Sequence, residues 1–247
     1  MDNQTLQIKF KQRINKIDSQ DFDNVECWQI VECFNKAQLD WCRRQLHGTN
    51  QFKEGDEASK KRIDDLQRLL VTASLPAVSE SENYVEYNIP GPIDNYFEYK
   101  RTTSYATKFE IDEYGKETDI PCCTEPRSMT VYLSEVASVD LIMRDPLKNP
   151  DFEWGETFCT MQGNTLRVYK TDFNITSTDF TYYRKPVYIQ IEGCRDPYTH
   201  GIGANIECEF KDDVVELLID EAVSILAGDI VDVNQYQREG SAVEKNN

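Results

Sequence analysis

The chain has 247 residues, which is enough for one large domain or two small ones. Its 44 acidic and 27 basic side chains give it a net charge of −17. Such a chain repels nucleic acid and anionic membranes on average, because phosphate binding depends on concentrated Lys and Arg. No stretch approaches 18 consecutive apolar residues, so the sequence predicts no membrane span and no membrane partner.

The first 20 residues are polar and helically periodic, unlike a secretory signal peptide. We therefore expect synthesis in the cytosol, where the eight cysteines would be thiols. Cys27, Cys33 and Cys42 fall in a predicted helix, where Cys acts as a small hydrophobic residue. The vicinal pair Cys122 and Cys123 is too strained for an ordinary disulfide.

Helical periodicity occupies about the first 75 residues. It predicts three amphipathic helices, at Gln4–Ile17, Asn24–Gln45 and Asp56–Ser74. In the first, the predicted apolar stripe consists of Leu6, Phe10, Ile14 and Ile17. The second begins at a capping box formed by Asp23 and Glu26 and stops before Gly48. The third is ended by Pro76. Each of these helices is too apolar on one side to stay alone, so they must pack on one another or on a neighbouring subunit.

From Asn83 onward the pattern changes to that of strands and turns. The predicted strands are Tyr96–Phe109, Met129–Leu133, Val139–Met143, Thr157–Met161, Thr165–Tyr169, Thr181–Tyr183 and Pro186–Ile191. Turns are predicted at 90–92, which reads Pro-Gly-Pro, and at 162–164, where Gly and Asn tolerate positive φ. Short strands with turns every 8–12 residues indicate a sandwich or a small barrel.

A last helix is predicted from Asp212, with Gly228 as its C-cap, acidic residues in its first turn and a wide apolar face. The predicted fold class is therefore α+β. An N-terminal three-helix bundle (residues 1–78) would be completed by the C-terminal helix (211–228). An antiparallel β-sandwich or barrel-like domain (79–210) would be inserted between them, and a polar tail (229–247) would follow, disordered when isolated.

No pattern of catalytic or metal-binding residues is evident. Cys194, His200 and Cys208 do not have the spacing of a zinc site, and His47 has no evident partner nucleophile. No phosphate-binding glycine motif occurs. We assign no catalytic, cofactor-binding or metal residue and predict that the chain is not an enzyme.

The remaining conspicuous side chains are interpreted as structural. The acidic pairs Asp64/Asp65 and Asp212/Asp213 fall on polar helix faces, where solvated charge is expected. The basic pairs Arg43/Arg44 and Lys60/Lys61 are too few for a nucleic-acid patch and are interpreted as intersubunit or intrahelical charge partners. The stripe containing Trp28 and Trp41 is interpreted as core, with a ligand platform as the alternative.

Three segments resemble structural proteins of crAss-like phages. The first is a helix at Trp28–Gln38, continued by Trp41 and Arg43–Gln45. The second is the strand motif Thr181–Pro186 (TYYRKP), and the third is the segment Val214–Tyr236. Together they cover about half of the chain. The order of helices, β region and helix resembles the head-to-tail adaptor rings of short-tailed phages.

This resemblance implies a virion structural protein of the neck or tail region, located in the host cytoplasm during assembly. Copies of the chain would form a homo-oligomeric ring, usually a dodecamer, that connects the portal protein to other neck or tail proteins. Genomic DNA would pass through the ring without sequence-specific contact. An acidic wall suits that role, because it repels phosphates and lets the DNA slide. The resemblance carries over no catalytic residue.

Two other functions are considered. The first is a tail- or capsid-associated protein whose β domain binds a carbohydrate or receptor, which would expose Tyr96, Tyr99 or Tyr105 around a groove. The second is a metal-dependent hydrolase that uses Asp and Glu, for which the sequence contains no motif.

Overall fold

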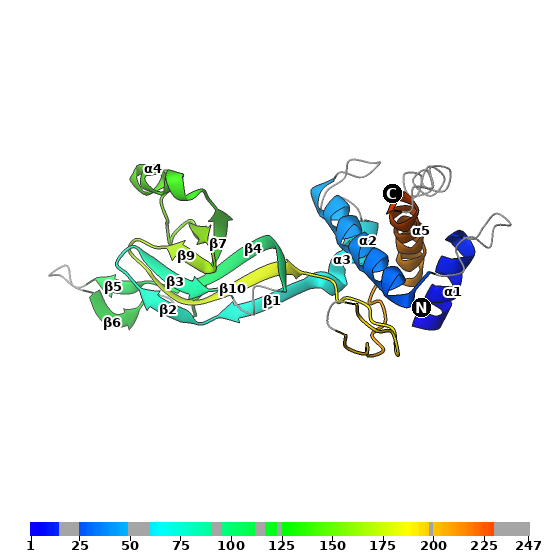
Figure 1. Ribbon diagram of the computed structural model, residues 1–247. Coiled ribbons are helices and arrows are strands. Elements are labelled where there is room, and N and C mark those ends of the chain that lie inside the picture. Colours follow the sequence, from blue (N-terminus) through cyan, green and yellow to red (C-terminus); the bar gives the residue numbers. More distant parts are fainter. Residues whose placement is uncertain are drawn as a thin grey trace. The chain divides into compact units, whose positions relative to one another are not determined.

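A computed structural model describes residues 1–14, 25–48, 60–89, 95–111, 117–122, 125–197 and 200–229. The chain divides into two compact units (Figure 1). Unit 1 comprises Met1–Leu69 and Pro186–Asn247, so it is built from both ends of the chain. Unit 2 is the continuous segment Leu70–Lys185. Among the described helices, none has both the length and the apolar composition that a membrane crossing requires.

Unit 1 is helical. Its helices are α1 (Asn3–Ile14), α2 (Cys27–His47), α3 (Lys60–Leu66), the 3-10 helix η2 (Gln67–Leu69) and α5 (Asp212–Asp229). Helix α5 packs against both α1 and α2, although it lies more than 160 residues after them (Figure 1). The predicted apolar stripe of the first helix is confirmed for Leu6, Phe10 and Ile14, all of which are buried, and Ile17 lies outside the described residues.

The two ends of α2 follow from local sequence. Glu26 and Gln29 form a capping box at its start, in place of the predicted Asp23 and Glu26 box; Asp23 lies outside the described residues. The Gln29 side chain accepts a hydrogen bond from the Glu26 backbone N–H at 3.0 Å. At the other end Gly48 adopts the left-handed conformation with φ 68°, which confirms it as the stop signal.

Charged side chains join α1 to α5. Glu216 pairs with Lys9 and Arg13, and Arg13 also contacts Asp220 at 2.8 Å. Burial raises the pKa of Glu216, but its hydrogen bond to Lys9 and the charge of Arg13 outweigh that effect and leave the pKa lowered. The acidic first turn of α5 also receives the N-terminal amino group, which lies 2.7 Å from Asp212. These contacts bring the first residues of the chain to the start of its last helix.

Unit 2 is dominated by a curled eight-stranded sheet in the order β1-β10-β4-β7-β8-β9-β3-β2. A separate hairpin pairs β5 with β6. The strands are β1 (Leu70–Leu75), β2 (Ala77–Glu80), β3 (Tyr84–Asn88), β4 (Tyr96–Thr107), β5 (Phe109–Ile111), β6 (Glu117–Pro121), β7 (Arg127–Leu133), β8 (Glu156–Gln162), β9 (Thr165–Tyr169) and β10 (Asn174–Arg184). Neighbouring strands are antiparallel except β7 and β8, which run parallel.

The core of this unit is apolar and continuous across the sheet. Its buried members come from six strands: Leu75, Val85, Tyr87, Val131, Cys159, Leu166, Val168, Phe180 and Tyr182. Strands β8 and β9 form the hairpin that the sequence predicts, with Gly163 and Asn164 between the paired residues Gln162 and Thr165. Gly163 supplies the positive φ of 59° that a two-residue turn needs.

The predicted fold class is wrong. The protein is a mixed α/β molecule dominated by one curled sheet, and the predicted N-terminal helical bundle is not evident. The predicted third helix, Asp56–Ser74, ends as an α-helix at Leu66, and Leu70–Leu75 forms strand β1. The reason is tertiary: β1 pairs in register with β10, from Leu70 opposite Tyr183 to Leu75 opposite Thr178, and this pairing overrides helical periodicity.

Three smaller predictions are also corrected. Val139–Met143 was expected as a strand but lies in helix α4 (Val139–Arg144), because a short apolar run does not distinguish strand from helix. Pro186–Ile191 was also expected as a strand, but it forms none and makes only an isolated β-bridge, from Gln190 to Ile206. Gly228 lies inside α5, which continues to Asp229. The predicted turn at 90–92 and tail at 230–247 lie outside the described residues.

Candidate interaction surfaces

Unit 1 contains a cavity of about 350 Å³ beside the start of α2, called here the Trp28 pocket. Helix α2 contributes Trp28, Val31, Glu32 and Asn35 to its wall, and the rest comes from the segment 188–203. Trp28 is half-buried, so its predicted place in the core is wrong, whereas the predicted burial of Trp41 is confirmed. Ile202 on the opposite wall is 79% exposed. The pocket is therefore mainly apolar, with carboxylates at its edge.

Asn35 attaches the 188–203 segment to α2. Its amide nitrogen donates to the Ile189 carbonyl at 3.3 Å, and its amide oxygen accepts from the Ile189 N–H at 2.9 Å. Gly203 lies close to the same segment, because a Cβ placed there would be 2.8 Å from the Ile191 carbonyl oxygen. The wall of the pocket is therefore held by hydrogen bonds between the Asn35 side chain and the Ile189 backbone, and by a close approach that only glycine permits.

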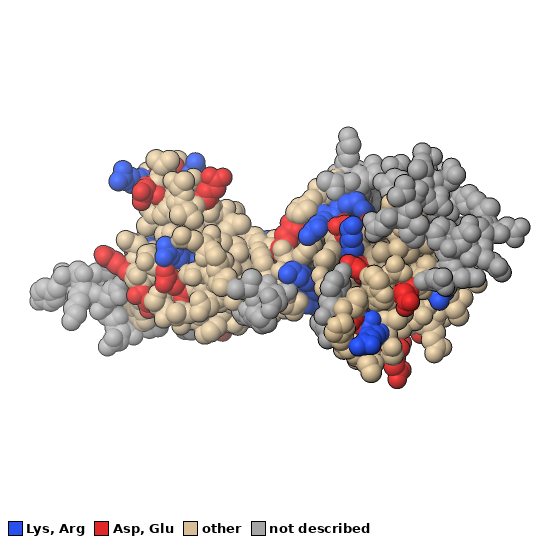
Figure 2. Space-filling model, in the orientation of Figure 1, with Lys and Arg blue, Asp and Glu red and all other residues tan. Residues whose placement is uncertain are grey.

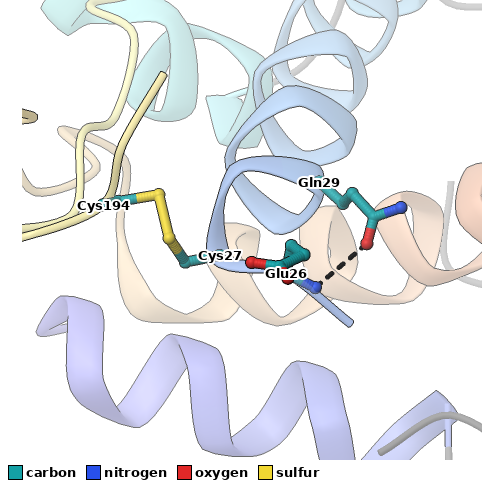
Figure 3. The surroundings of a disulfide bond; sticks show 4 residues. All are labelled: Glu26, Cys27, Gln29 and Cys194. Atoms are coloured by element: carbon teal, nitrogen blue, oxygen red, sulfur yellow. Dashed lines mark hydrogen bonds between the residues drawn. A yellow bond between two sulfur atoms is a disulfide. The ribbon is translucent and has the colours of Figure 1, made fainter. Parts of the chain in front are cut away.

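A disulfide joins Cys27 to Cys194, and Cys194 is one of the residues that line the pocket (Figure 3). Cys27 is the first residue of α2 and Cys194 lies in the 188–203 segment, 167 residues later. The prediction that the cysteines are thiols is therefore wrong for this pair. The sequence held no sign of the pairing, because the two residues meet only through the long-range packing of unit 1.

Unit 2 presents a second apolar surface, which originates in the parallel pairing of β7 and β8. Parallel strands cannot be joined by a tight turn and need a crossover of a dozen or more residues. Residues 134–155 make that crossover and carry the 3-10 helix η3 (Val136–Ser138) and helix α4. Figure 1 shows α4 projecting from the sheet beyond the end of β7.

Asp151 holds the end of the crossover in place. Its backbone carbonyl accepts the Gly155 N–H at 3.1 Å, and its carboxylate accepts the Trp154 N–H at 2.8 Å. Phe152 is buried against Phe173 and under the Arg127 guanidinium. With Phe152 fixed inside the unit, Trp154 lies outside it, with 64% of its surface exposed.

Six large apolar side chains of this region are exposed, and together they define the crossover surface: Tyr132, Leu133, Val136, Leu141, Leu147 and Trp154. Four of them, Tyr132, Leu133, Leu147 and Trp154, line one cavity of about 330 Å³. The Tyr132 hydroxyl donates to Glu156 at 3.2 Å, and this hydrogen bond raises the pKa of the phenol. Scattered exposed apolar residues are normal, but a cluster around a cavity is typical of an interaction site.

The structure does not bring together Cys194, His200 and Cys208, the metal ligands considered in the sequence analysis. Cys194 is in the disulfide, and the Cys208 thiol is buried beside the Gln38 amide oxygen at 3.7 Å. Burial raises the pKa of Cys208 to about 11, so this thiol is protonated at neutral pH. Within the described ranges, no group of three or more His, Cys, Asp or Glu side chains could hold a metal ion.

The acidic and basic pairs weighed from the sequence have structural contacts. Asp64 pairs with Lys211, whereas Asp65 is buried, contrary to the expectation of a solvated face. Arg43 contacts Asp40 at 3.3 Å on the same helix, as predicted for an intrahelical partner. Arg44 instead reaches α5, where its guanidinium donates two hydrogen bonds to Glu221, one of them at 2.7 Å.

The three tyrosines proposed to surround a carbohydrate groove, Tyr96, Tyr99 and Tyr105, are all half-buried. The rings of Tyr96 and Tyr99 pack against Phe180 in the core of unit 2. Burial raises the pKa of Tyr99 to about 12. The exposed aromatic side chains that line a cavity in this unit are Tyr132 and Trp154, which the sequence analysis did not single out.

No protein-family model matches the chain, and no curated protein is significantly similar to it.

Proposed function

We propose that the chain is a structural protein of a short-tailed phage virion, which forms a ring between portal and tail and lets the genome pass. The observation that carries this proposal is the pair of exposed apolar surfaces, one in each unit. Protein-binding sites characteristically combine exposed aromatic and apolar side chains with a polar rim. A protein that must touch neighbours on more than one side needs more than one such surface.

Two further observations support the proposal. The net charge of −17 suits a wall past which DNA slides, because phosphates are repelled instead of bound. The Cys27–Cys194 disulfide suits a protein that leaves the reducing cytosol in a particle, because disulfides persist at virion surfaces. The resemblance of Trp28–Gln38, Thr181–Pro186 and Val214–Tyr236 to crAss-like phage structural proteins points to the same role.

Reconstitution with the portal protein encoded in the same genome tests this proposal. The purified chain is mixed with portal rings, and native mass spectrometry measures the stoichiometry of the product. We expect a complex that contains several copies of this chain per portal, with twelve as the expected number. A mixture in which chain and portal remain separate at micromolar concentrations would contradict the proposal.

A second candidate function is binding of a carbohydrate receptor, and one observation favours it. Trp154 and Tyr132 line a cavity that also contains the carboxylates of Asp151 and Glu156. Aromatic faces beside hydrogen-bond acceptors suit a sugar, which has apolar faces and hydroxyl donors. Binding of a defined glycan to the purified chain, lost in Trp154→Ala, would favour this function.

A further inference from the structure

The side chains of the crossover surface leave a large apolar area exposed. Leu141 and Leu147 are 72% and 73% exposed, and Trp154 is little less so. These three residues belong to one connection between two strands, and Leu147 and Trp154 share one cavity. Exposed apolar clusters of this kind are found where a partner covers them.

The surface is already ordered without a partner. Backbone and side-chain hydrogen bonds from Asp151 fix the end of the crossover, and the Leu147 N–H donates to the Asp145 carboxylate at 3.0 Å. Thr171 donates to the Pro150 carbonyl at 2.8 Å, which attaches the connection to the rest of the unit. A partner would therefore bind without the cost of ordering this connection.

The charge around the surface favours one kind of partner. Residues 132–156 carry six carboxylates and only two cations, Arg144 and Lys148. Lys148 is engaged in part, because it lies 3.9 Å from Asp145. Figure 2 shows both signs of charge around the uncharged surface of the α4 region. The excess of carboxylates over cations attracts Lys and Arg of a partner, and an exposed Trp ring binds cations on its face.

The same charge argues against a second copy of this chain as the occupant. Two identical crossover surfaces in contact would bring their six carboxylates each into opposition. Like charges opposed across an interface disfavour it. The occupant that fits both the apolar cavity and the excess of carboxylates is a basic segment of a different protein.

We propose that the crossover surface binds a basic segment of another protein, which inserts a bulky apolar side chain into the cavity lined by Tyr132, Leu147 and Trp154. The inference deepens the proposed function and rests on it for the source of the partner, a neighbouring component of the particle. In this proposal, ring formation by this chain is a separate contact that does not use this cavity.

Fluorescein-labelled synthetic peptides test the proposal by fluorescence anisotropy with the full chain. The first peptide has two central leucines flanked on each side by lysines. The second replaces the lysines with glutamates, and the third replaces the leucines with serines. We expect the first to bind at least about tenfold more tightly than either of the others, and to weaken about fivefold when salt rises from roughly 0.05 to 0.3 M.

Variants of the chain locate the binding. Trp154→Ala is expected to weaken binding of the first peptide at least about tenfold, as for a central aromatic anchor. Val78→Ser is the matched control, because Val78 is an exposed apolar residue of unit 2 in β2, outside the crossover surface. It is expected to leave the affinity within about twofold, and circular dichroism verifies that both variants fold.

Several results would overturn the proposal. They are no binding of the first peptide at millimolar concentration, equal binding of the glutamate peptide, or unchanged affinity in Trp154→Ala. Loss of self-association in Trp154→Ala, measured by sedimentation, would identify a second copy as the occupant, and glycan binding lost in that variant would identify a sugar. The peptide-binding results do not bear on whether the chain joins a portal ring, so the two proposals fail independently.

Discussion

At the scale of single residues, two tryptophans of the same helix have different roles because of their positions on it. Trp41 is buried in unit 1, and its ring meets Phe210 edge-on at a centroid distance of 5.2 Å. Trp28 lies at the start of the helix, lines the Trp28 pocket and is half-buried. Sequence periodicity assigned both to one stripe, because it records spacing and not what covers each end of the helix.

Alanine substitution of each tryptophan distinguishes the buried Trp41 from the pocket-lining Trp28. Trp41→Ala should lower the free energy of unfolding by roughly 3–5 kcal/mol, because a buried ring is lost and a cavity remains. Trp28→Ala should cost only roughly 1–2 kcal/mol, because less of its surface leaves water on folding. Urea unfolding of both variants measures these values. A larger loss for Trp28 than for Trp41 would contradict the assignment.

The disulfide gives a second prediction at this scale. Cys194→Ser should destabilise the protein by about 2–4 kcal/mol, since the bond constrains a long loop in the unfolded chain. Cys122→Ser is the control, because Cys122 is exposed and should cost little. Peptide mapping of the unreduced protein should recover Cys27 and Cys194 in one linked fragment. Recovery of both as alkylated thiols would count against the bond.

At the scale of elements, one ion pair connects α2 to α5. Glu221 is buried, and burial raises its pKa even though the hydrogen bond from Arg44 acts in the opposite direction. Burial, together with the nearby negative charge of Asp40, therefore outweighs the effect of Arg44 on the pKa of this carboxyl. Such a pair contributes little net stability, although losing one partner leaves the other uncompensated.

Apolar replacement of the pair tests this balance. Glu221→Leu alone should destabilise the chain by about 1–3 kcal/mol, because Arg44 loses its partner in a largely buried place. Arg44→Met together with Glu221→Leu should restore stability to within about 1 kcal/mol of wild type or exceed it. Arg43→Met, which breaks only an exposed intrahelical contact, should change stability by less than about 0.5 kcal/mol. A double variant as unstable as Glu221→Leu would refute the balance described.

Elements set by local pattern were predictable, and elements set by distant partners were not. Leu6, Phe10 and Ile14 recur at helical spacing, and Gly163 marks its turn by the conformation it alone adopts readily. Strand β1 was missed because its state depends on β10, more than 100 residues later. The crossover surface was missed for a related reason: only the parallel pairing of β7 and β8 turns residues 134–155 into a projecting connection.

At the scale of the whole molecule, the charge of −17 and the apolar surfaces act in opposite directions. The charge keeps copies of the chain apart and leaves a polyanion mobile nearby, whereas apolar surfaces stabilise contacts once they form. Assembly should therefore be favoured by salt where copies of this chain meet, and opposed by salt where a basic partner meets the crossover surface. This opposite dependence distinguishes the two kinds of contact in one set of experiments.

The most direct test of the central claim is cryo-electron microscopy of a virion whose genome encodes this chain. We predict a closed ring of copies between portal and tail, with density that fits the helical unit 1 and the eight-stranded unit 2 in every copy. DNA should pass through the lumen without ordered contacts to the wall. A neck reconstruction with no density for this chain, or the chain found as single copies elsewhere on the particle, would contradict the account.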